Sequence, residues 1–281
     1  MLKSSDPSLK DDLNHRGETN GPTSSTSHKD ASFSNDLFQI LWINENKHFW
    51  FHHRCDLIAW ALKRYFADAR SFLEIGCGNG FVLEYLEARL PSISFWGAEL
   101  FADGLAYARK RLARTTLIQM DIFESPLKAD FDVIGLLDVI EHLDDDESAL
   151  KRAFDHIKPG GGAIITVPQH PSLWSEKDIG AFHKRRYTKS GLRNLLEKTG
   201  FTILRITSFI SFLMPALFIS RKLQTGSRHD DLFDEFSIPP VLNAICGKVC
   251  KLEGFFIKKG LSMPFGGSLM AIVKKPERRH H

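Results

Sequence analysis

The sequence predicts an α/β fold: an open, mostly parallel sheet with helices on both faces. A strand-like apolar run at 71–75 leads into a turn with three glycines at alternate positions, and residues 81–90 then place apolar side chains at helical spacing. The glycines are Gly76, Gly78 and Gly80. Strand, tight glycine turn and helix in this order form the first unit of such a sheet. Strand-like and helical segments alternate along the remaining chain, and 281 residues that are 43% hydrophobic suffice for one such domain with additions.

The expected elements follow in chain order. Strand-like runs rich in β-branched, aromatic and aliphatic residues occupy 71–75, 92–99, 116–120, 131–138, 163–167, 201–207 and 268–274. Helical spacing is found up to about residue 66 after an aromatic-rich segment that begins near Leu37, and over 81–90, 101–112, 149–157 and 188–198. The sequence K-P-G-G-G at 158–162 predicts a sharp turn before the fifth strand.

The chain is expected to divide into a tail, a domain and an insertion. Residues 1–35 consist mostly of small polar and charged residues, without an aromatic residue before Phe33. Such a segment buries too little surface to offset its ordering entropy, so it is predicted to be disordered. The domain would then occupy 36–281, with a helical, apolar insertion at 208–262 before the last strand.

The insertion contains an apolar run at 209–219 and a segment at 239–259 in which apolar faces alternate with lysines. A helix that spans a bilayer needs about 20 apolar residues. The run is shorter than this and is interrupted by Pro215. Three roles therefore stay open for the insertion: an extra helical layer packed on the domain, a contact with a membrane surface, or a wall of an apolar substrate pocket.

Composition bears on partners and compartment. The formal charge of +3 is nearly balanced and does not point to nucleic acid. Four scattered cysteines match neither a zinc-binding nor a redox spacing, and the first residues lack the apolar core of a signal peptide. We therefore expect a cytoplasmic protein without a metal site, with peripheral membrane contact if the insertion touches lipid.

The glycine turn predicts a cofactor that contains a nucleoside. A dinucleotide-binding turn would carry Gly or Ala at position 81, where this chain has Phe81. The pattern is instead E-x-G-x-G-x-G, with Glu74 at the end of the strand. Glu99 ends the second strand, where a carboxylate can accept hydrogen bonds from both hydroxyls of a ribose. A lone glutamate is otherwise a solvated surface group, and its distance from the glycine turn favours the ribose.

Four motifs resemble, in order, those of the class I S-adenosylmethionine (SAM)-dependent methyltransferases, over about residues 49–207. The motifs are E-x-G-x-G-x-G at 74–80, an acid after the third strand at Asp121, D-V-I-E-H at 138–142 and K-P-G-G-G at 158–162. The resemblance implies a Rossmann-like, seven-stranded methyltransferase sheet, SAM as the cofactor, and methyl transfer to a small molecule.

The resemblance also implies which residues bind SAM. Glu74 and the three glycines would hold the methionine end, Glu99 the ribose and Asp121 the adenine. Arg54 would meet the cofactor carboxylate if the aromatic segment before the first strand forms a lid and does not simply pack on the domain. The full implied set is Arg54, Glu74, Gly76, Gly78, Gly80, Glu99, Asp121, Ile122, Leu137, Asp138 and Ile140.

Two histidines and the segment H-x-R-R-Y at 183–187 are expected on the acceptor side. The segment resembles one in a methyltransferase subgroup whose acceptors are mostly unassigned, which implies that Arg185 and Tyr187 bind the acceptor. His142 or His183 could remove the proton of an acceptor hydroxyl, and His142 could equally orient its own loop. No metal cluster is apparent in the sequence, although some quinone methyltransferases use a divalent ion beside the loop that carries His142.

The expected function is transfer of a methyl group from SAM to a small, lipid-like or isoprenoid-linked acceptor, with O-methylation favoured. The alternative is a SAM-binding module without turnover that acts as a membrane-associated partner protein, and turnover with any acceptor separates the two. A nicotinamide oxidoreductase is a third hypothesis, and Phe81 counts against it.

Overall fold

The computed structural model describes residues 35–125, 127, 130–215 and 238–277. Residues 1–34 of the tail expected at 1–35 lie outside the described residues. Residues 216–237 of the expected insertion also lie outside them. The described residues form the predicted α/β fold.

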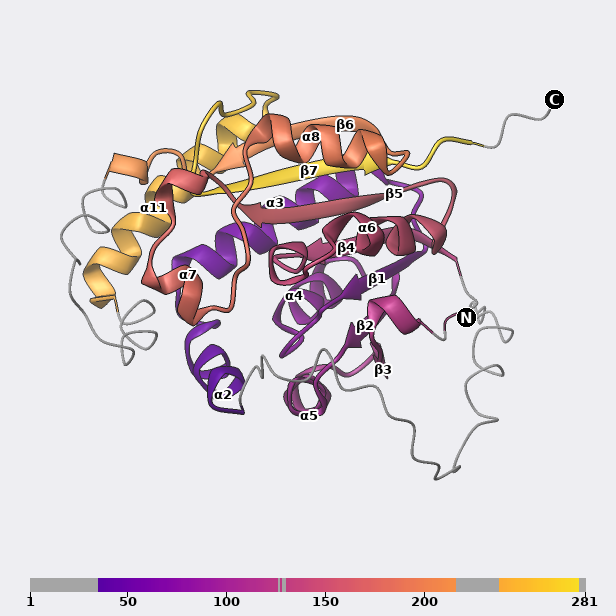
Figure 1. The fold of residues 1–281 in the computed structure, drawn as a ribbon. Coiled ribbons are helices and arrows are strands. Elements are labelled where there is room, and N and C mark those ends of the chain that lie inside the picture. The colour runs from indigo at the N-terminus through magenta and orange to yellow at the C-terminus, as the bar shows by residue number, and fades with distance from the viewer. Residues whose placement is uncertain (1–34, 126, 128–129, 216–237, 278–281) are drawn as a thin grey trace. The chain divides into compact units, whose positions relative to one another are not determined.

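A seven-stranded sheet is the frame of this fold (Figure 1). Its strands are β1 (Ser71–Ile75), β2 (Ser94–Glu99), β3 (Thr116–Gln119), β4 (Phe131–Leu137), β5 (Ile157–Pro168), β6 (Thr202–Phe209) and β7 (Ser268–Lys274). They lie in the order β3-β2-β1-β4-β5-β7-β6, and all neighbours are parallel except β7, which is antiparallel to β5 and β6. The chain order reverses between β1 and β4, and α/β proteins bind ligands at the carboxyl ends of strands beside such a reversal.

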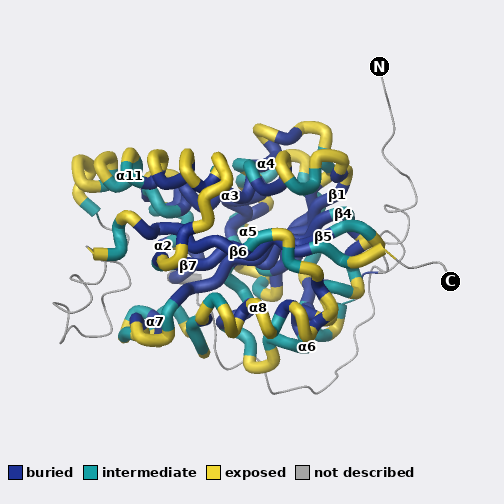
Figure 2. Tube along the Cα trace, turned by 90° about the horizontal axis from the view of Figure 1, so that it is seen from above, coloured by how far each residue is buried: buried dark blue, intermediate teal, exposed yellow. Residues whose placement is uncertain are grey.

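Helices cover both faces of the sheet. They are α2 (Asn35–Asn44), α3 (Phe49–Tyr65), α4 (Phe81–Arg89), α5 (Ala102–Arg111), α6 (Asp146–Asp155), α7 (Glu176–Gly180), α8 (Lys189–Lys198) and α11 (Pro240–Lys258), with 3-10 turns η1 (Ile122–Glu124), η2 (Ile140–His142) and η3 (Pro171–Leu173). Seen from above, α3, α4 and α11 lie on one side of the strands and α6 and α8 on the other (Figure 2). Strands β1 and β4 are buried along nearly their whole length, which explains their continuous apolar sequences.

Strand β5 begins at Ile157, so the sharp turn predicted at 158–162 is wrong. The K-P-G-G-G sequence continues the strand because it pairs with the chain beyond β7: Gly160 N donates to the Lys275 carbonyl at 3.1 Å, and Lys275 N donates to the Gly161 carbonyl at 2.8 Å. Glycine is needed here for packing, since a Cβ at Gly162 would lie 2.2 Å from a backbone carbonyl oxygen of β7.

Helix α6 begins at Asp146, three residues before the predicted start at 149. The side chain of Asp145 accepts a hydrogen bond from Ser148 N at 2.9 Å. This is an N-terminal cap, which satisfies one of the backbone donors at the start of a helix. The helix therefore begins with a polar turn, which the spacing of apolar residues in the sequence did not reveal.

The aromatic-rich N-terminal segment forms two helices, α2 and α3, where the sequence indicated a single helix after an irregular lead. His48 separates them, because its side chain accepts a hydrogen bond from Trp50 N at 3.2 Å and caps α3. Helix α2 lies beside the glycine turn: the side-chain amide of Asn79 donates to the Phe38 carbonyl at 2.8 Å. Glu45, just after α2, pairs with Arg111 of α5 at 2.9 Å.

The described part of the insertion packs on the domain through a buried carboxylate. Glu253 of α11 is 1% exposed. It accepts hydrogen bonds from the backbone N–H groups of Ile210 at 2.7 Å, Ser211 at 2.5 Å and Phe212 at 3.0 Å. His53 Nε2 of α3 lies 3.2 Å from the same carboxylate. Glu253 thus joins α11, α3 and the chain just after β6, so α11 forms the extra helical layer that was one of the three expected roles.

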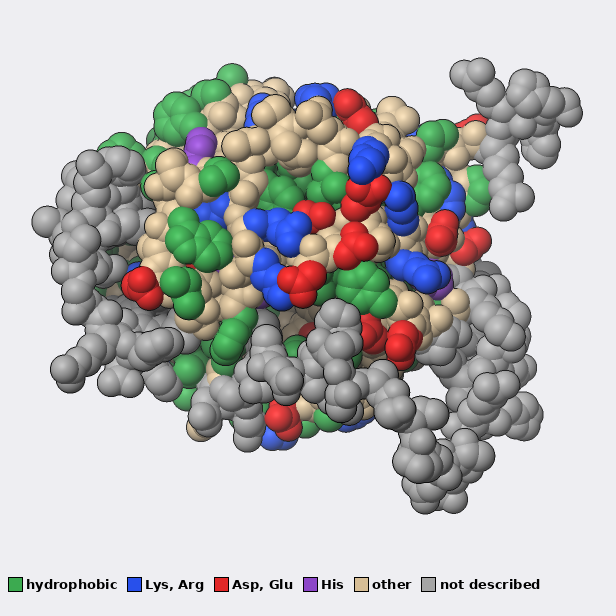
Figure 3. Space-filling view, in the orientation of Figure 1, with side chains coloured by type: hydrophobic (Ala, Val, Ile, Leu, Met, Phe, Trp, Pro, Cys, Tyr) green, Lys and Arg blue, Asp and Glu red, His purple; other side chains and the backbone are tan. Residues whose placement is uncertain are grey.

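Figure 3 shows the face of the molecule that Figure 1 presents. Lysine and arginine side chains are interspersed with aspartate and glutamate over the middle of this face. Such mixing agrees with the nearly balanced formal charge of +3.

Candidate functional site

The glycine turn after β1 is an open cradle. Gly76, Gly78 and Gly80 have φ angles of 74°, 51° and 75°, in the left-handed region that favours glycine. A Cβ at Gly76 would lie 2.6 Å from a methyl group of Val139, and one at Gly80 would lie 2.7 Å from Leu112. At Gly78, by contrast, nothing lies within 4 Å of the added atom. Backbone at Gly78 therefore faces open space in which a ligand can lie against the main chain.

Glu99 is fixed beside this turn. Its two oxygens accept hydrogen bonds from Gly78 N at 2.8 Å and Phe101 N at 3.0 Å, and the residue is 6% exposed. Burial raises the pKa of Glu99, although the backbone hydrogen bonds oppose this effect. A carboxylate has about four acceptor positions. The positions that remain can accept hydrogen bonds from hydroxyl groups next to the open turn.

Arg54 and Asp138, both predicted to bind the cofactor, form an ion pair. Arg54 is 9% exposed, and its guanidinium lies 4.6 Å from the centre of the Trp50 ring. Asp138 follows β4 and has a φ of 59°, an uncommon backbone conformation for a residue other than glycine. Backbone strain of this kind clusters at functional sites.

Glu74 is a buried carboxyl group on the same edge. It is 3% exposed, and its Oε2 has no hydrogen-bond partner among the described residues. Burial raises its pKa to about 8; Arg54 opposes the shift, and the negative charges of Glu45, Glu99 and Asp138 reinforce it. A bound cationic group would stabilise the ionised form of this carboxyl.

The remaining predicted cofactor residues lie near the ends of β3 and β4. Asp121 caps η1, because its Oδ1 accepts a hydrogen bond from Phe123 N at 2.9 Å, so it fills the turn-forming role that any aspartate could fill there. Ile122, Leu137 and Ile140 are 6%, 4% and 0% exposed. Apart from Arg54, which comes from α3 and reaches Asp138, the predicted cofactor set therefore lies along the carboxyl ends of the four strands β1 to β4, where the parallel sheet brings them to one edge.

His142 and His183 face each other, with ring centroids 4.9 Å apart. His142 Nδ1 lies 3.3 Å from the carbonyl oxygen of Phe182, so this ring helps to hold the neighbouring segment. Burial, together with the nearby His183, lowers the pKa of His142 to about 4. His142 is therefore neutral at physiological pH.

Asp178 orients His183, a contact that the sequence analysis missed. Its Oδ1 lies 3.0 Å from His183 Nδ1 and 2.6 Å from Arg186 Nε, and the side chain is 1% exposed. Ser175 N donates to the other oxygen at 2.9 Å, which places Asp178 in a capping box at the start of α7. In the sequence, the spacing of Ser175 and Asp178 is typical of a capping box at the start of a helix. This spacing does not reveal that Asp178 also contacts His183.

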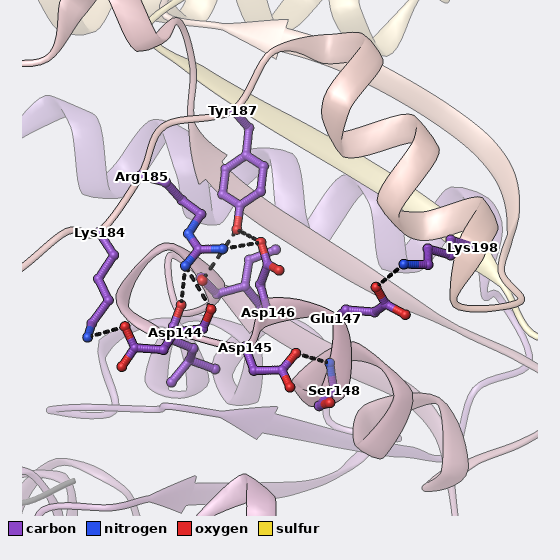
Figure 4. A network of polar contacts seen from close by, with 11 residues as sticks. Asp144, Asp145, Asp146, Glu147, Ser148, Lys184, Arg185, Tyr187 and Lys198 are labelled. Carbon is purple, nitrogen blue, oxygen red and sulfur yellow. Dashed lines mark hydrogen bonds and ion pairs between the residues drawn. The ribbon is translucent and has the colours of Figure 1, made fainter. Parts of the chain in front are cut away.

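Arg185 and Tyr187 point toward the turn that follows β4 (Figure 4). Arg185 donates to the carbonyls of Leu143 and Asp144 at 3.0 and 2.9 Å and pairs with Asp146 at 3.1 Å. The Tyr187 hydroxyl donates to the carboxylate of Asp146 at 2.7 Å. Both side chains thus fasten the 183–187 segment to the rest of the domain.

Glu141 completes a group that could hold a cation. It is 0% exposed, and neither carboxylate oxygen has a hydrogen-bond partner among the described residues. Ligand atoms of Glu141, His142 and His183 all lie within 4.8 Å of one another, and carboxylate with imidazole suits a divalent transition metal. No metal site was expected from the sequence, in which His183 stands about 40 residues from His142 and joins this group only through the fold.

Comparison with known proteins agrees with this fold. A family model described as "Methyltransferase domain" matches residues 45–206. Over 131 residues the chain is 24% identical to a ubiquinone biosynthesis O-methyltransferase of Pseudomonas fluorescens, with 44% of this chain and 56% of that protein covered. Over 126 residues it is 29% identical to the dTDP-3-amino-3,4,6-trideoxy-alpha-D-glucopyranose N,N-dimethyltransferase of Streptomyces venezuelae, with 42% and 51% covered. The chain thus spans about half the length of the curated relatives it matches.

Solved structures share the same architecture. The plantazolicin methyltransferase BpumL in complex with SAH superposes with a TM-score of 0.57 at 16% identity, covering 86% of this chain and 90% of that one. An O-methyltransferase family protein from Burkholderia thailandensis gives 0.56 at 12% identity, with 87% and 60% covered. At these identities the likeness concerns the fold.

Proposed function

This chain belongs to the class I SAM-dependent methyltransferases, and we propose that it transfers a methyl group from SAM to a hydroxyl group of a small, lipid-like acceptor. The observation that carries the proposal is the sheet edge on which the open turn at Gly78, the fixed carboxylate of Glu99 and the His183–Asp178 pair all lie. Residues at this edge of the sheet could both bind the cofactor and remove a proton from the acceptor.

The observed contacts support the proposed cofactor assignments. The open backbone of Gly78 and the buried Glu74 would receive the methionine end of SAM, whose cationic groups would stabilise the Glu74 carboxylate. Glu99 would accept hydrogen bonds from the ribose hydroxyls, and the Asp121 carboxylate, whose Oδ1 already accepts one from Phe123 N, would accept a hydrogen bond from the adenine amino group. Arg54, held by Asp138, would meet the cofactor carboxylate.

His183 is the proposed proton acceptor. SAM supplies an electrophilic methyl group on its sulfonium. The acceptor oxygen forms a bond to the methyl carbon as the carbon–sulfur bond breaks, and His183 takes the hydroxyl proton. Asp178 would hold His183 in the tautomer that leaves Nε2 available and would stabilise the imidazolium that forms. His142 and the pair Arg185 and Tyr187 would position the segment that carries His183.

Replacing Glu99 by alanine tests the cofactor site. The variant is expected to bind SAM and its demethylated product SAH about 10- to 100-fold more weakly in calorimetric titration, because hydrogen bonds to a charged group contribute about 1.5–3 kcal/mol. Glu124→Ala is the matched control, since Glu124 is exposed on η1 near the same edge, and its affinities should stay within about twofold. Unchanged SAH binding by the Glu99 variant would contradict the proposal that Glu99 binds the cofactor.

Transfer of labelled methyl from SAM tests the reaction itself. The wild-type chain, incubated with lipid extracts and with aqueous metabolite extracts, is expected to label an organic-soluble product as a methyl ether, and the Glu99→Ala variant is expected to label little. If the wild-type chain binds SAH but labels nothing in either extract, the alternative of a SAM-binding module without turnover would be favoured. Label on a nitrogen or carbon atom of the product would support methyltransferase activity but contradict the proposal that the acceptor is a hydroxyl group.

One face of α11 supports a lipid-like acceptor and contact with a membrane surface. Its exposed apolar residues are Val241, Leu242, Ile245, Leu252, Phe255 and Phe256, between 38% and 73% exposed, and lysines alternate with them at 248, 251 and 258. Helices of this composition bind at the interface of anionic membranes. The side chain of Asn243 bonds to Phe49 N at 3.0 Å and to the Lys47 carbonyl at 2.8 Å, so α11 begins at the junction of α2 and α3. Among the described helices, none has the length and apolar character needed to cross a bilayer.

Flotation with vesicles tests this contact. The chain is expected to float with phosphatidylglycerol vesicles more than with phosphatidylcholine vesicles. Leu252→Ser should weaken the association about tenfold, because an exposed leucine would lose about 1.4 kcal/mol of apolar burial. Leu204→Ser, an exposed leucine on β6, should change it little. Equal loss in both variants, or no flotation of the wild-type chain, would contradict the contact.

A further inference from the structure

A cleft of about 470 Å³ lies where β5 ends, α8 begins and the chain approaches β7. Gln169 and His170 come directly after β5, Thr188 and Lys189 start α8, and Pro264 precedes β7; all five line the cleft. None of them has a part in the methyl transfer proposed above. The cleft is therefore a separate feature on the carboxyl side of the sheet.

The cleft carries positive charge. Lys189 and Arg193 line it, and the described lining residues include no aspartate or glutamate. Arg193 is paired with Glu197 at 3.5 Å, and both of these side chains are about half exposed, so the pair is weak. The N-terminal end of α8, a helix of 10 residues, adds the positive end of its dipole to the same space.

A buried side chain in the cleft lacks a partner. Gln169 is 2% exposed, and its Oε1 makes no hydrogen bond to any described residue. A buried amide group without a hydrogen-bond partner destabilises a protein. Because Gln169 lines the cleft, rotation of its amide would let it form a hydrogen bond to a ligand there. The hydroxyls of Thr188 and Ser190, 3.3 Å apart, offer further hydrogen bonds at the mouth.

Direct contacts connect the cleft to the proposed proton acceptor. The carbonyl of Gln169 accepts a hydrogen bond from Arg186 Nη1 at 2.9 Å. Arg186 Nε in turn donates to Asp178, which holds His183. Three hydrogen-bonded contacts thus connect Gln169, which lines the cleft, with His183.

We propose that this cleft binds a phosphoryl group of the methyl acceptor, so that the acceptor is a phosphate ester. Lysine, arginine, hydroxyl groups and a helix N-terminus are the groups with which proteins bind phosphate. Clefts of this size hold whole small-molecule ligands, so carbon-bearing parts of the ester enter with the phosphate. The inference rests on the proposed methyl transfer and names the class of its acceptor.

Calorimetric titration of the full chain saturated with SAH tests the inference. The probes are inorganic phosphate, glucose 1-phosphate, and phosphatidylcholine vesicles that contain phosphatidic acid. At least one of the two esters is expected to bind more tightly than inorganic phosphate, and Lys189→Gln should weaken that binding about tenfold. Lys198→Gln is the matched control on the same helix: the Lys198 side chain is 68% exposed and pairs with Glu147, and the substitution should change binding by less than about twofold.

The two ester arms separate the sources of the phosphate. Lys189-dependent binding of glucose 1-phosphate identifies a soluble phosphorylated acceptor, and such binding to the phosphatidate vesicles alone identifies a lipid phosphate. Lack of ester binding, equal loss in the two lysine variants, or binding of inorganic phosphate as tight as that of the esters would overturn the inference. Failure to bind SAH would instead remove the proposed function, since SAH binding is measured first in the same experiment.

Discussion

Replacing His183 by asparagine is expected to lower the rate of methyl transfer by about 10²- to 10⁴-fold, the usual contribution of a positioned general base. The physical reason is the pairing of His183 Nδ1 with the buried Asp178 at 3.0 Å, which orients the ring and leaves Nε2 available to take the proton. Single-turnover label transfer from SAM would measure the effect. The dissociation constant for SAH should change by less than about twofold, because His183 lies outside the proposed cofactor set.

His156→Asn is the matched control, since His156 caps the far end of α6 next to the start of β4. It should leave the transfer rate unchanged. Asp178→Asn should slow transfer as well, and part of its effect should appear as lost stability because Arg186 would remain buried without its carboxylate. If the wild-type rate falls on adding a chelator and returns with a divalent ion, Glu141, His142 and His183 bind a metal and the role of His183 as a base is wrong.

Replacing Glu253 by glutamine is expected to lower the free energy of unfolding by about 2 to 5 kcal/mol, since two or more buried donors would lose their acceptor at about 1–3 kcal/mol each. The carboxylate accepts hydrogen bonds from three backbone N–H groups and lies 3.2 Å from His53. Glutamine keeps the shape but offers one oxygen and turns an amide N–H₂ toward the remaining donors. Urea unfolding at pH 7 would measure the change.

The Glu253 effect should fade in acid. Burial raises the pKa of Glu253, but the hydrogen bonds from His53, Phe212 and Ser211 lower it by more than burial raises it. The pKa of Glu253 therefore lies below its usual value. A carboxylate with a lowered folded pKa stabilises the fold above its unfolded pKa and loses this contribution as pH falls through the folded value. The two proteins should therefore converge in stability at low pH. Glu197→Gln, on the exposed face of α8, should cost less than about 0.5 kcal/mol at either pH.

The sheet and the cofactor side of the site could be predicted because their signals are local. A glycine turn between an apolar strand and a helix specifies its own geometry, and Glu99 stands at the end of the next strand, which a parallel sheet must place alongside. The strand β7 was predicted correctly at 268–274, because a continuous run of apolar residues marks it even far from its partners.

The acceptor side could not be predicted in the same way. Asp178 and His183 meet through a short helix and a loop, and no periodicity relates them. Arg185 and Tyr187 are expected to bind the acceptor from their resemblance and place in the chain, and this stays a prediction; their contacts with Asp146 had no signal in the sequence. Glu253 looked like one more charged residue on an amphipathic helix, and only the backbone donors after β6 explain why it is buried.

The position of β7 between β5 and β6 has a consequence for biosynthesis. Strand β6 leaves the ribosome long before β7, and its only strand neighbour in the sheet of the described residues is β7. At about 5–20 residues per second, synthesis of residues 210–267 takes about 3 to 12 s. During that time the nascent chain carries an unpaired β5 edge and an unpaired β6, which are open to wrong pairing. We therefore expect nascent chains that end before residue 268 to require chaperone protection, and full-length chains to complete their sheet only as the last strand enters it.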